Sequence, residues 1–135
     1  MLFRSEDVIS GRGLERLFAF VTTEAGAPLE ATAAEIVAGI ASPGPAQRAV
    51  RLMVRLLGAE AGNLALIHLP FGGVFLCGGV ARALAPHLAA MGFAESFRDK
   101  GRFAGFMQNF AVSVITDDYA ALTGCAVYLA RGAKG

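Results

Sequence analysis

The hydrophobic positions in the first half of this chain follow the spacing of helices. Ser10 is a good N-cap residue for a first helix that runs to about Thr22. The apolar face of this helix holds Leu14, Leu17, Phe18 and Val21. A capping box of Thr32 and Glu35 predicts a second, shorter helix, whose apolar side consists of Ile36, Val37 and Ile40. Both helices are amphipathic, so we expect each to pack one face against a core.

The longest predicted helix covers residues 46 to about 69 and ends at Pro70. One face of this helix carries the basic side chains of Arg48, Arg51 and Arg55 in its first half. The same face continues with Gly58 and Gly62, which have no side chain. The other positions of its second half are apolar or small, so we expect that half to be buried. Each of the two glycines costs roughly 1 kcal/mol of helix propensity relative to alanine. Close packing against a neighbouring backbone would offset this cost.

Two short apolar runs follow, and each leads into a helix. The run Val74–Cys77 is bounded by glycines, which is typical of a strand covered on both faces. The run Ala111–Ile115 predicts a second strand. Helices are expected from about Arg82 to Met91 and from Tyr119 to Ala130. This order predicts two parallel strands joined by a right-handed crossover, and hence an α/β fold.

Individual side chains in this second half add more specific expectations. Pro86 is tolerated only in the first turn of a helix, so the helix around it should begin late, near Arg82. Its inner face consists of Val80, Leu84, Leu88 and Met91, and Gly92 is its C-cap. Thr116, Asp117 or Asp118 caps the last helix. That helix should pack inward through Leu122, Cys125, Ala126 and Leu129.

The segment between the two strands combines aromatic and charged residues. Its expected anchors on the core are Phe93, Phe97, Phe103 and Phe106. The charges at Asp99, Lys100 and Arg102 fit a surface turn closed by local ion pairs better than a catalytic group, because no acid–base partner lies near them. His68, at the end of the long helix, is interpreted as a capping or packing histidine.

Composition limits the classes of partner. The 135 residues make one domain or part of one, and 55% hydrophobic residues with a mean hydropathy of +0.54 are unusual for a free-standing domain. A net charge of +1 points away from nucleic acid and from anionic membranes. The first residues lack the apolar core of a secretion signal, and the window 64–76 is too short to span a bilayer. Cys77 and Cys125 are expected to be buried thiols in a reducing cytoplasm.

The pair Gly78-Gly79 is the main candidate for a binding site. Glycines at this point let the backbone adopt unusual angles and let a flat ligand lie against it. The helix that follows would point free N–H groups at an anion or a phosphate. A tight strand-to-helix turn with glycines for geometry alone explains the same residues.

Several segments resemble the C-terminal part of bacterial ATP-dependent glucokinases. They are Phe71–Phe93, Phe97–Phe103 and Leu122–Leu129, with Val8–Leu14 and Gly62–Leu66 upstream. The resemblance runs through nearly the whole chain, but covers only about the last two-fifths of a family member. It implies a helix-rich piece of a ribonuclease-H-like domain of the actin-like ATPase superfamily, with a short parallel sheet. We expect a single domain over residues 1–135, with a helical segment 1–70 followed by a strand–helix segment 71–135.

The resemblance also carries expectations about ligands. Gly78 and Gly79 match the adenosine-binding turn of the family, and Val80 follows directly behind them as a further expected nucleotide-binding residue. Ser10 and Gly11 match a segment that lies near the cleft, although helix capping explains these two residues better. The family uses ATP and Mg²⁺ to phosphorylate glucose. Its Asp-x-Gly-Gly-Thr loop, its Asn-Asp pair and its Glu-x-x-His set are not found in this sequence. The groups that bind Mg²⁺ and glucose are therefore expected outside this chain, which should be inactive alone.

Three interpretations fit these observations. The chain is the C-terminal portion of a glucokinase, whether trimmed, given a shifted start or naturally truncated; Met1 followed at once by a family-like segment favours an artificial or shifted start. Alternatively it is a non-catalytic truncated homologue that acts as a dimerisation or nucleotide-binding module, with adenine nucleotide or the full enzyme as its partner. In the third interpretation, another chain supplies the missing first half. Because two strands leave open edges, we expect self-association, most simply as a homodimer.

Overall fold

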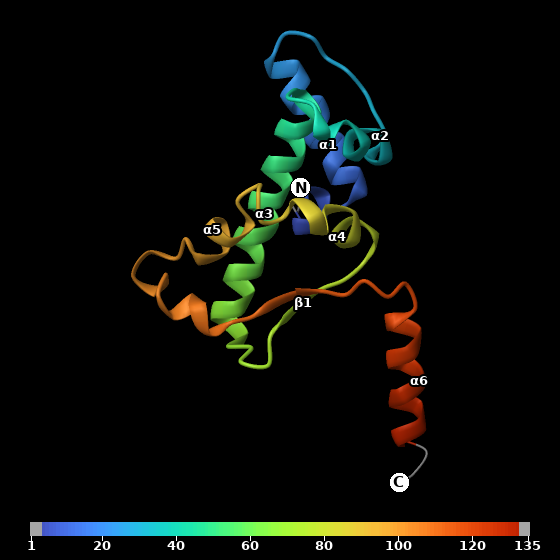
Figure 1. Cartoon of the computed structure of the whole chain (residues 1–135), viewed down its shortest axis with the longest axis vertical. Coiled ribbons are helices and arrows are strands. Elements are labelled where there is room, and N and C mark those ends of the chain that lie inside the picture. Colours follow the sequence, from blue (N-terminus) through green and yellow to red (C-terminus); the bar gives the residue numbers. More distant parts are fainter. Residues whose placement is uncertain (1–3, 133–135) are drawn as a thin grey trace.

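The computed structural model describes residues 4–132, which form a helix-rich fold with one two-stranded sheet (Figure 1). The helices are α1 (Gly11–Glu24), α2 (Ala33–Ala38), α3 (Pro45–His68), α4 (Gly79–Leu84), α5 (Phe93–Arg98) and α6 (Ala120–Gly132). The strands are β1 (Val74–Leu76) and β2 (Val112–Val114). Short 3₁₀ turns connect them at Ser5–Asp7, Gly39–Ala41, Ala85–His87, Gly101–Phe103 and Phe106–Asn109.

The first two helices form as the sequence predicts. The Ser10 hydroxyl accepts a hydrogen bond from the Gly13 N–H at 3.0 Å, which caps α1. The capping box of α2 is complete, because Thr32 accepts from the Glu35 N–H and the Glu35 carboxylate accepts from the Thr32 N–H. The predicted apolar positions Leu14, Phe18, Val21, Ile36 and Ile40 are buried, and Leu17 and Val37 are partly buried.

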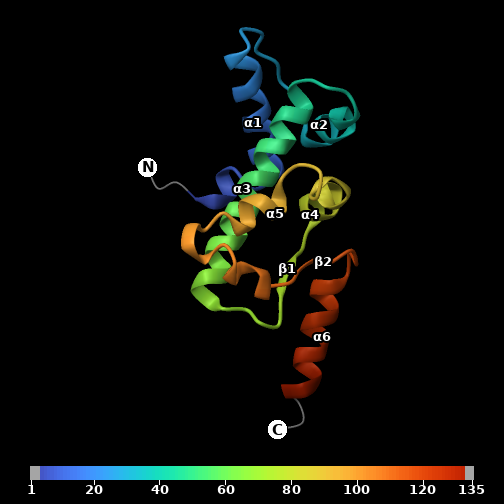
Figure 2. The same ribbon diagram turned by 60° about the vertical axis from the view of Figure 1, so that its left-hand side comes forward.

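Helix α3 is the central element, and α1 and α5 pack along it (Figure 2). The predicted close approach at its two glycines is confirmed. A Cβ atom placed on Gly58 would lie 2.5 Å from the carbonyl oxygen of Phe93, and one on Gly62 would clash with the carbonyl oxygen of Phe97. The basic ridge of Arg48, Arg51 and Arg55 is exposed, as predicted.

The second half of α3 is only partly buried, so the prediction for it was wrong on one side. Ala61 and Ala65 are buried, whereas Leu64 and Ile67 are exposed. The reason is that α1 and α5 cover one part of the helix circumference, and nothing in residues 4–132 covers the rest. His68 is exposed in the last turn, and Leu69 ends the helix with a left-handed backbone at φ 49°.

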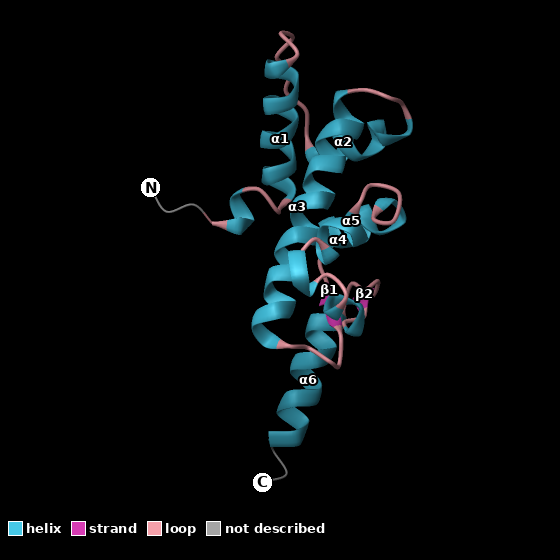
Figure 3. Ribbon diagram, turned by 90° about the vertical axis from the view of Figure 1, so that its left-hand side faces the viewer, coloured by secondary structure: helices cyan, strands magenta, loops and turns pink. Residues whose placement is uncertain are grey.

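The two strands pair in parallel, as predicted, with Val74 opposite Val112 and Leu76 opposite Val114 (Figure 3). Their coverage differs from the expectation. Val74, Leu76 and Val112 pack against the core, but Phe75 points away from it and is 60% exposed. The sheet is therefore covered on one face only among the residues described.

Helix α4 starts at Gly79, earlier than expected, and ends at Leu84. Pro86 explains the early end, because its ring has no N–H to donate and clashes with a helical carbonyl one turn back. A proline near this helix therefore limits its end rather than its beginning. Leu84 and Met91 are buried as predicted, and Gly92 closes the following turn with φ 89°.

Helix α6 extends away from the rest of the fold (Figure 1). None of its residues is buried, so the expected inward packing through Leu122, Cys125, Ala126 and Leu129 was wrong. Leu122 is 67% exposed and Leu129 is 69% exposed. Residues 4–132 supply no element against these side chains. Cys77 and Cys125 are both free and exposed, which corrects the expected burial of their thiols.

The connection between α5 and β2 only partly follows the prediction. Phe93 and Phe97 are buried and stack with ring centroids 6.1 Å apart, whereas Phe103 and Phe106 are exposed. The expected local ion pairs do not form within residues 4–132. Instead, the Lys100 ammonium donates to the Ala59 carbonyl at 3.1 Å, and Arg102 lies over the Phe103 ring at 4.9 Å. In this turn the basic side chains therefore contact a backbone carbonyl and an aromatic ring instead of carboxylates.

No helix in the described part of the chain is long and apolar enough to cross a membrane.

Candidate functional site

The turn between β1 and α4 has a backbone that favours glycine. Gly78 has φ 102°, a region that L side chains rarely adopt. Its carbonyl accepts from the Arg82 N–H at 3.1 Å, which closes the first turn of α4. A Cβ atom on Gly78 or Gly79 would meet nothing within 4 Å. The turn therefore presents bare backbone to open space, and crowding inside the fold does not explain these two glycines.

An apolar hollow of about 400 Å³ lies beside this turn. Three helices contribute to it: α1 through Leu14, α2 through Ala33, Ala34 and Val37, and α4 through Gly79, Val80 and Ala83. None of these side chains is polar, so the hollow suits the flat, weakly polar face of an aromatic ring. Gly79 and Val80 thus line one cavity together, and Gly78 directly precedes them.

Ser10 and Gly11 line a different cavity, of about 430 Å³, with Glu6, Asp7, Arg12 and Arg16. The pKa of Asp7 lies below its ordinary value, because its carboxylate accepts from the Arg4 N–H and from the Arg16 guanidinium. The two cavities adjoin through α2, since a Cβ atom on Gly11 would lie 3.9 Å from that of Ala33. The sequence-predicted residues therefore fall in two neighbouring hollows, one apolar and one charged.

The family model named Glucokinase matches residues 3–132. The chain belongs to the glucokinase family. A structure-based comparison agrees: the crystal structure of a glucokinase from an Antarctic psychrotroph superposes with a TM-score of 0.81 at 27% identity, over 93% of this chain and 40% of that one. The predicted helix-rich piece of an actin-like ATPase fold with a short parallel sheet is confirmed.

Two named glucokinases illustrate how much of a family member this chain represents. The glucokinase of Mesorhizobium japonicum (strain LMG 29417 / CECT 9101 / MAFF 303099) is 40% identical over 126 residues, which are 91% of this chain and 37% of that protein. The glucokinase of Yersinia pestis (strain Pestoides F) is 36% identical over 128 residues, which are 93% of this chain and 40% of that protein. The chain thus spans about two-fifths of these relatives and matches the C-terminal portion of the family.

Helix α2 forms one wall of the apolar hollow beside the Gly78-Gly79 turn, and sequence reasoning did not assign this helix to a site. A signal was present, because the capping box encloses the small pair Ala33-Ala34, which leaves room beside the helix. The first turn of α2 is also fixed from α1, since the Glu15 carboxylate accepts from the Ala33 N–H at 3.0 Å. The wall of the hollow is thus oriented by hydrogen bonds rather than by packing alone.

Replacing Thr32 with alanine should loosen this wall and lower the free energy of unfolding by about 1 kcal/mol. The pKa of Glu35 lies below its ordinary 4.5, because its carboxylate accepts from the Thr32 hydroxyl and N–H. These bonds therefore stabilise the fold above pH 4.5, and the effect is lost as pH falls through the lower folded pKa. Urea unfolding should show the full Thr32→Ala effect at pH 7 and a smaller one at about pH 3.5. Thr23→Ala is the control, and a pH-independent Thr32→Ala effect would contradict this account.

An ion pair joins the glycine turn to the last helix. The Arg82 guanidinium on α4 contacts the Asp118 carboxylate, which lies just before α6. The Asp117 carboxylate accepts from the Tyr119 N–H at 2.9 Å, so it closes the turn that leads into α6 and does not bond an N–H group of the helix itself. The two aspartates thus have separate structural roles, and Arg82 ties the start of α6 to the candidate site.

Proposed function

We propose that this chain carries the adenosine side of the ATP site of an ATP:glucose 6-phosphotransferase, the first step of glycolysis. One observation carries the proposal: Gly79, which matches the family's adenosine-binding turn, and the adjacent Val80 line an apolar hollow that opens beside the exposed turn at Gly78. In this role Gly78 supplies the turn, Gly79 leaves room for the ligand, and Val80 contacts the base. Helix α4 has only six residues, so we assign recognition to the hollow and not to a helix terminus.

The residues present fit part of ATP. An adenine ring is flat and can lie against the apolar wall made by Leu14, Ala34 and Val80. Mg²⁺ requires several oxygen ligands, and within residues 4–132 no group of three or more histidine, cysteine, aspartate or glutamate side chains could hold a metal ion. We therefore propose that Mg²⁺ would be held with the phosphates by groups outside this part of the family fold.

Glucose binding and phosphoryl transfer are likewise assigned to groups outside this chain. A sugar kinase needs a base for the attacking hydroxyl and a loop for the transferred phosphate. The family motifs for both are not in the sequence. We propose that glucose meets this chain only through the rest of the enzyme, and that the chain alone is inactive. The cytoplasm is the proposed location, which suits the exposed free thiols of Cys77 and Cys125.

A second candidate function is a non-catalytic homologue that dimerises and binds adenine nucleotide. The exposed apolar side chains of α6, together with Phe75, favour it, because a second copy could cover them. The two candidates share the nucleotide site and differ in what contacts α6.

Replacing Gly79 with phenylalanine should abolish adenine-nucleotide binding, because the new ring would occupy the hollow. The backbone at Gly79 accepts a side chain and has open space around it, so the fold should survive. Binding can be followed by competition against a fluorescent ADP analogue. Gly124→Phe is the matched control, since Gly124 is also open but lies on α6. Unchanged nucleotide affinity in Gly79→Phe would refute the proposed site.

A further inference from the structure

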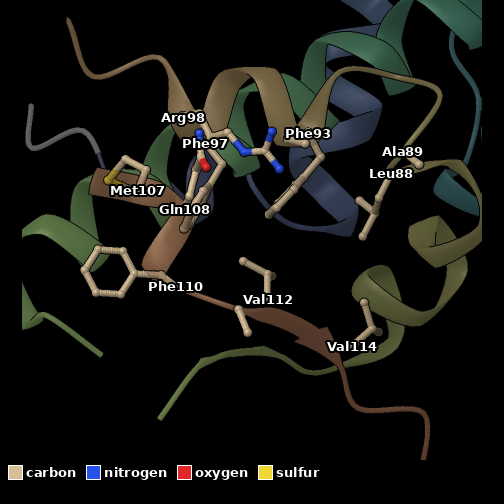
Figure 4. A pocket seen from close by; sticks show the side chains of 12 residues that line it. Leu88, Ala89, Phe93, Phe97, Arg98, Met107, Gln108, Phe110, Val112 and Val114 are labelled. Carbon is tan, nitrogen blue, oxygen red and sulfur yellow. The ribbon is translucent and has the colours of Figure 1, made fainter. Parts of the chain in front are cut away.

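A larger cavity lies on the other side of the core, between α5 and β2 (Figure 4). Its volume is about 730 Å³, within the range of roughly 300 to 1,000 Å³ typical of small-molecule sites. Most of the residues that line it are apolar, among them Leu88, Phe93, Phe97, Met107, Phe110 and Val112, and polar backbone and side-chain atoms also contribute to its surface. It shares no lining residue with the apolar hollow beside the Gly78-Gly79 turn.

Arg98 gives this cavity a single charge. It is the only charged residue that lines it, and the other large polar side chain is Gln108. Figure 4 shows the Arg98 side chain extended along the α5 side of the cavity toward Phe93. No ion pair to Arg98 is formed within residues 4–132, although Asp99 is its neighbour in sequence. The guanidinium therefore offers its donors to a ligand that brings its own anion.

We propose that this cavity binds a monocarboxylic acid with an apolar body, such as a medium-chain fatty acid. The carboxylate would pair with Arg98 and accept from the Gln108 amide, while the chain would lie among the phenylalanine and valine side chains. A cationic amphiphile is disfavoured because no acidic residue lines the cavity. A neutral amphiphile gains the apolar contacts but not the ion pair. This inference goes beyond the proposed function and does not depend on it.

Met107 makes the proposal directly testable. Its side chain lines the cavity and is buried, whereas Met53 and Met91 are buried but do not line the cavity. In protein labelled with [¹³C-methyl]methionine, octanoate should shift the Met107 resonance saturably and leave those of Met53 and Met91 in place. Octanol should bind about tenfold more weakly, and octylammonium should not bind.

Arg98→Gln should reduce octanoate affinity about tenfold, to that of octanol, without changing octanol affinity. Arg102→Gln is the matched control, since Arg102 lies on the same connection but does not line the cavity. Ala94→Leu, which narrows the cavity, should weaken octanoate and octanol alike. Equal binding of octanoate and octylammonium, or octanoate affinity unchanged by Arg98→Gln, would overturn the proposal. So would shifts at Met53 and Met91 with none at Met107.

Discussion

Replacing Gly62 with leucine should lower the free energy of unfolding by about 3 kcal/mol, because overpacking at a helix contact is costly. A Cβ atom at this position would clash with the Phe97 carbonyl oxygen and lie 2.7 Å from the Lys100 Cε atom. The Lys100 side chain can move away, but the Phe97 carbonyl is backbone of α5. The leucine would therefore push α5 off α3, and urea or thermal unfolding followed by circular dichroism measures the loss.

Alanine substitutions distinguish close packing at Gly62 from ordinary helix propensity, because the two effects change the free energy of unfolding in opposite directions. Glycine to alanine normally stabilises a helix interior by about 1 kcal/mol. Gly124→Ala on α6 should follow that rule, because nothing lies within 4 Å of its Cβ position. Gly62→Ala should do the opposite and destabilise the protein. If both substitutions stabilise it, the close α3–α5 packing described here is wrong.

The second large effect concerns activity. The chain alone should show no glucose phosphorylation, and activity should appear when it is co-expressed with the N-terminal three-fifths of the Mesorhizobium japonicum glucokinase. The reason is that the chain matches only 37% of that protein and lacks the family's phosphate-loop and sugar-binding motifs. A coupled assay of the co-purified chains measures the gain. Glucose phosphorylation by the chain alone would contradict the proposed division of the site.

Charged substitutions on α6 provide the control for this complementation. Tyr128 and Leu129 are 79% and 69% exposed, so Tyr128→Lys and Leu129→Lys should leave the isolated chain folded. Both should weaken co-purification with the other portion if that portion covers α6. Phe20→Lys, at an exposed apolar position on α1, should have no effect. If the α6 substitutions instead dissociate a homodimer and leave co-purification intact, a second copy covers this face.

Local signals predicted most of the fold. Ser10 and the Thr32–Glu35 pair fix the starts of α1 and α2, and the bare face at Gly58 and Gly62 correctly predicted a close helix contact. The errors in burial share one physical cause. Apolar residues such as Phe75, Ile67 and Leu129 were expected to be buried, because their pattern requires a partner surface. The spacing of apolar residues indicates that one face of a helix or strand packs against another element. It does not indicate whether that element belongs to the same stretch of chain.

Only the Gly78-Gly79 turn of the candidate site could be predicted from the sequence. Gly78 and Gly79 stand out because they follow a strand directly, and their open backbone matches that expectation. The opposite wall could not be predicted, because Ala33, Ala34 and Val37 have no chemistry of their own and reach the turn through tertiary packing. Ser10 and Gly11 were placed near a cleft by resemblance, and the structure assigns them to the adjoining charged cavity.

The most direct test of the central claim is a calorimetric titration of the purified wild-type chain with magnesium-ATP, with ADP and with glucose in separate experiments. We expect weak, saturable binding of both nucleotides and no heat from glucose. That result would place the adenosine site on this chain and the sugar site on the rest of the enzyme. Binding of glucose would show that a sugar site exists here after all. The absence of nucleotide binding would contradict the account, because the hollow beside Gly79 would then have no ligand.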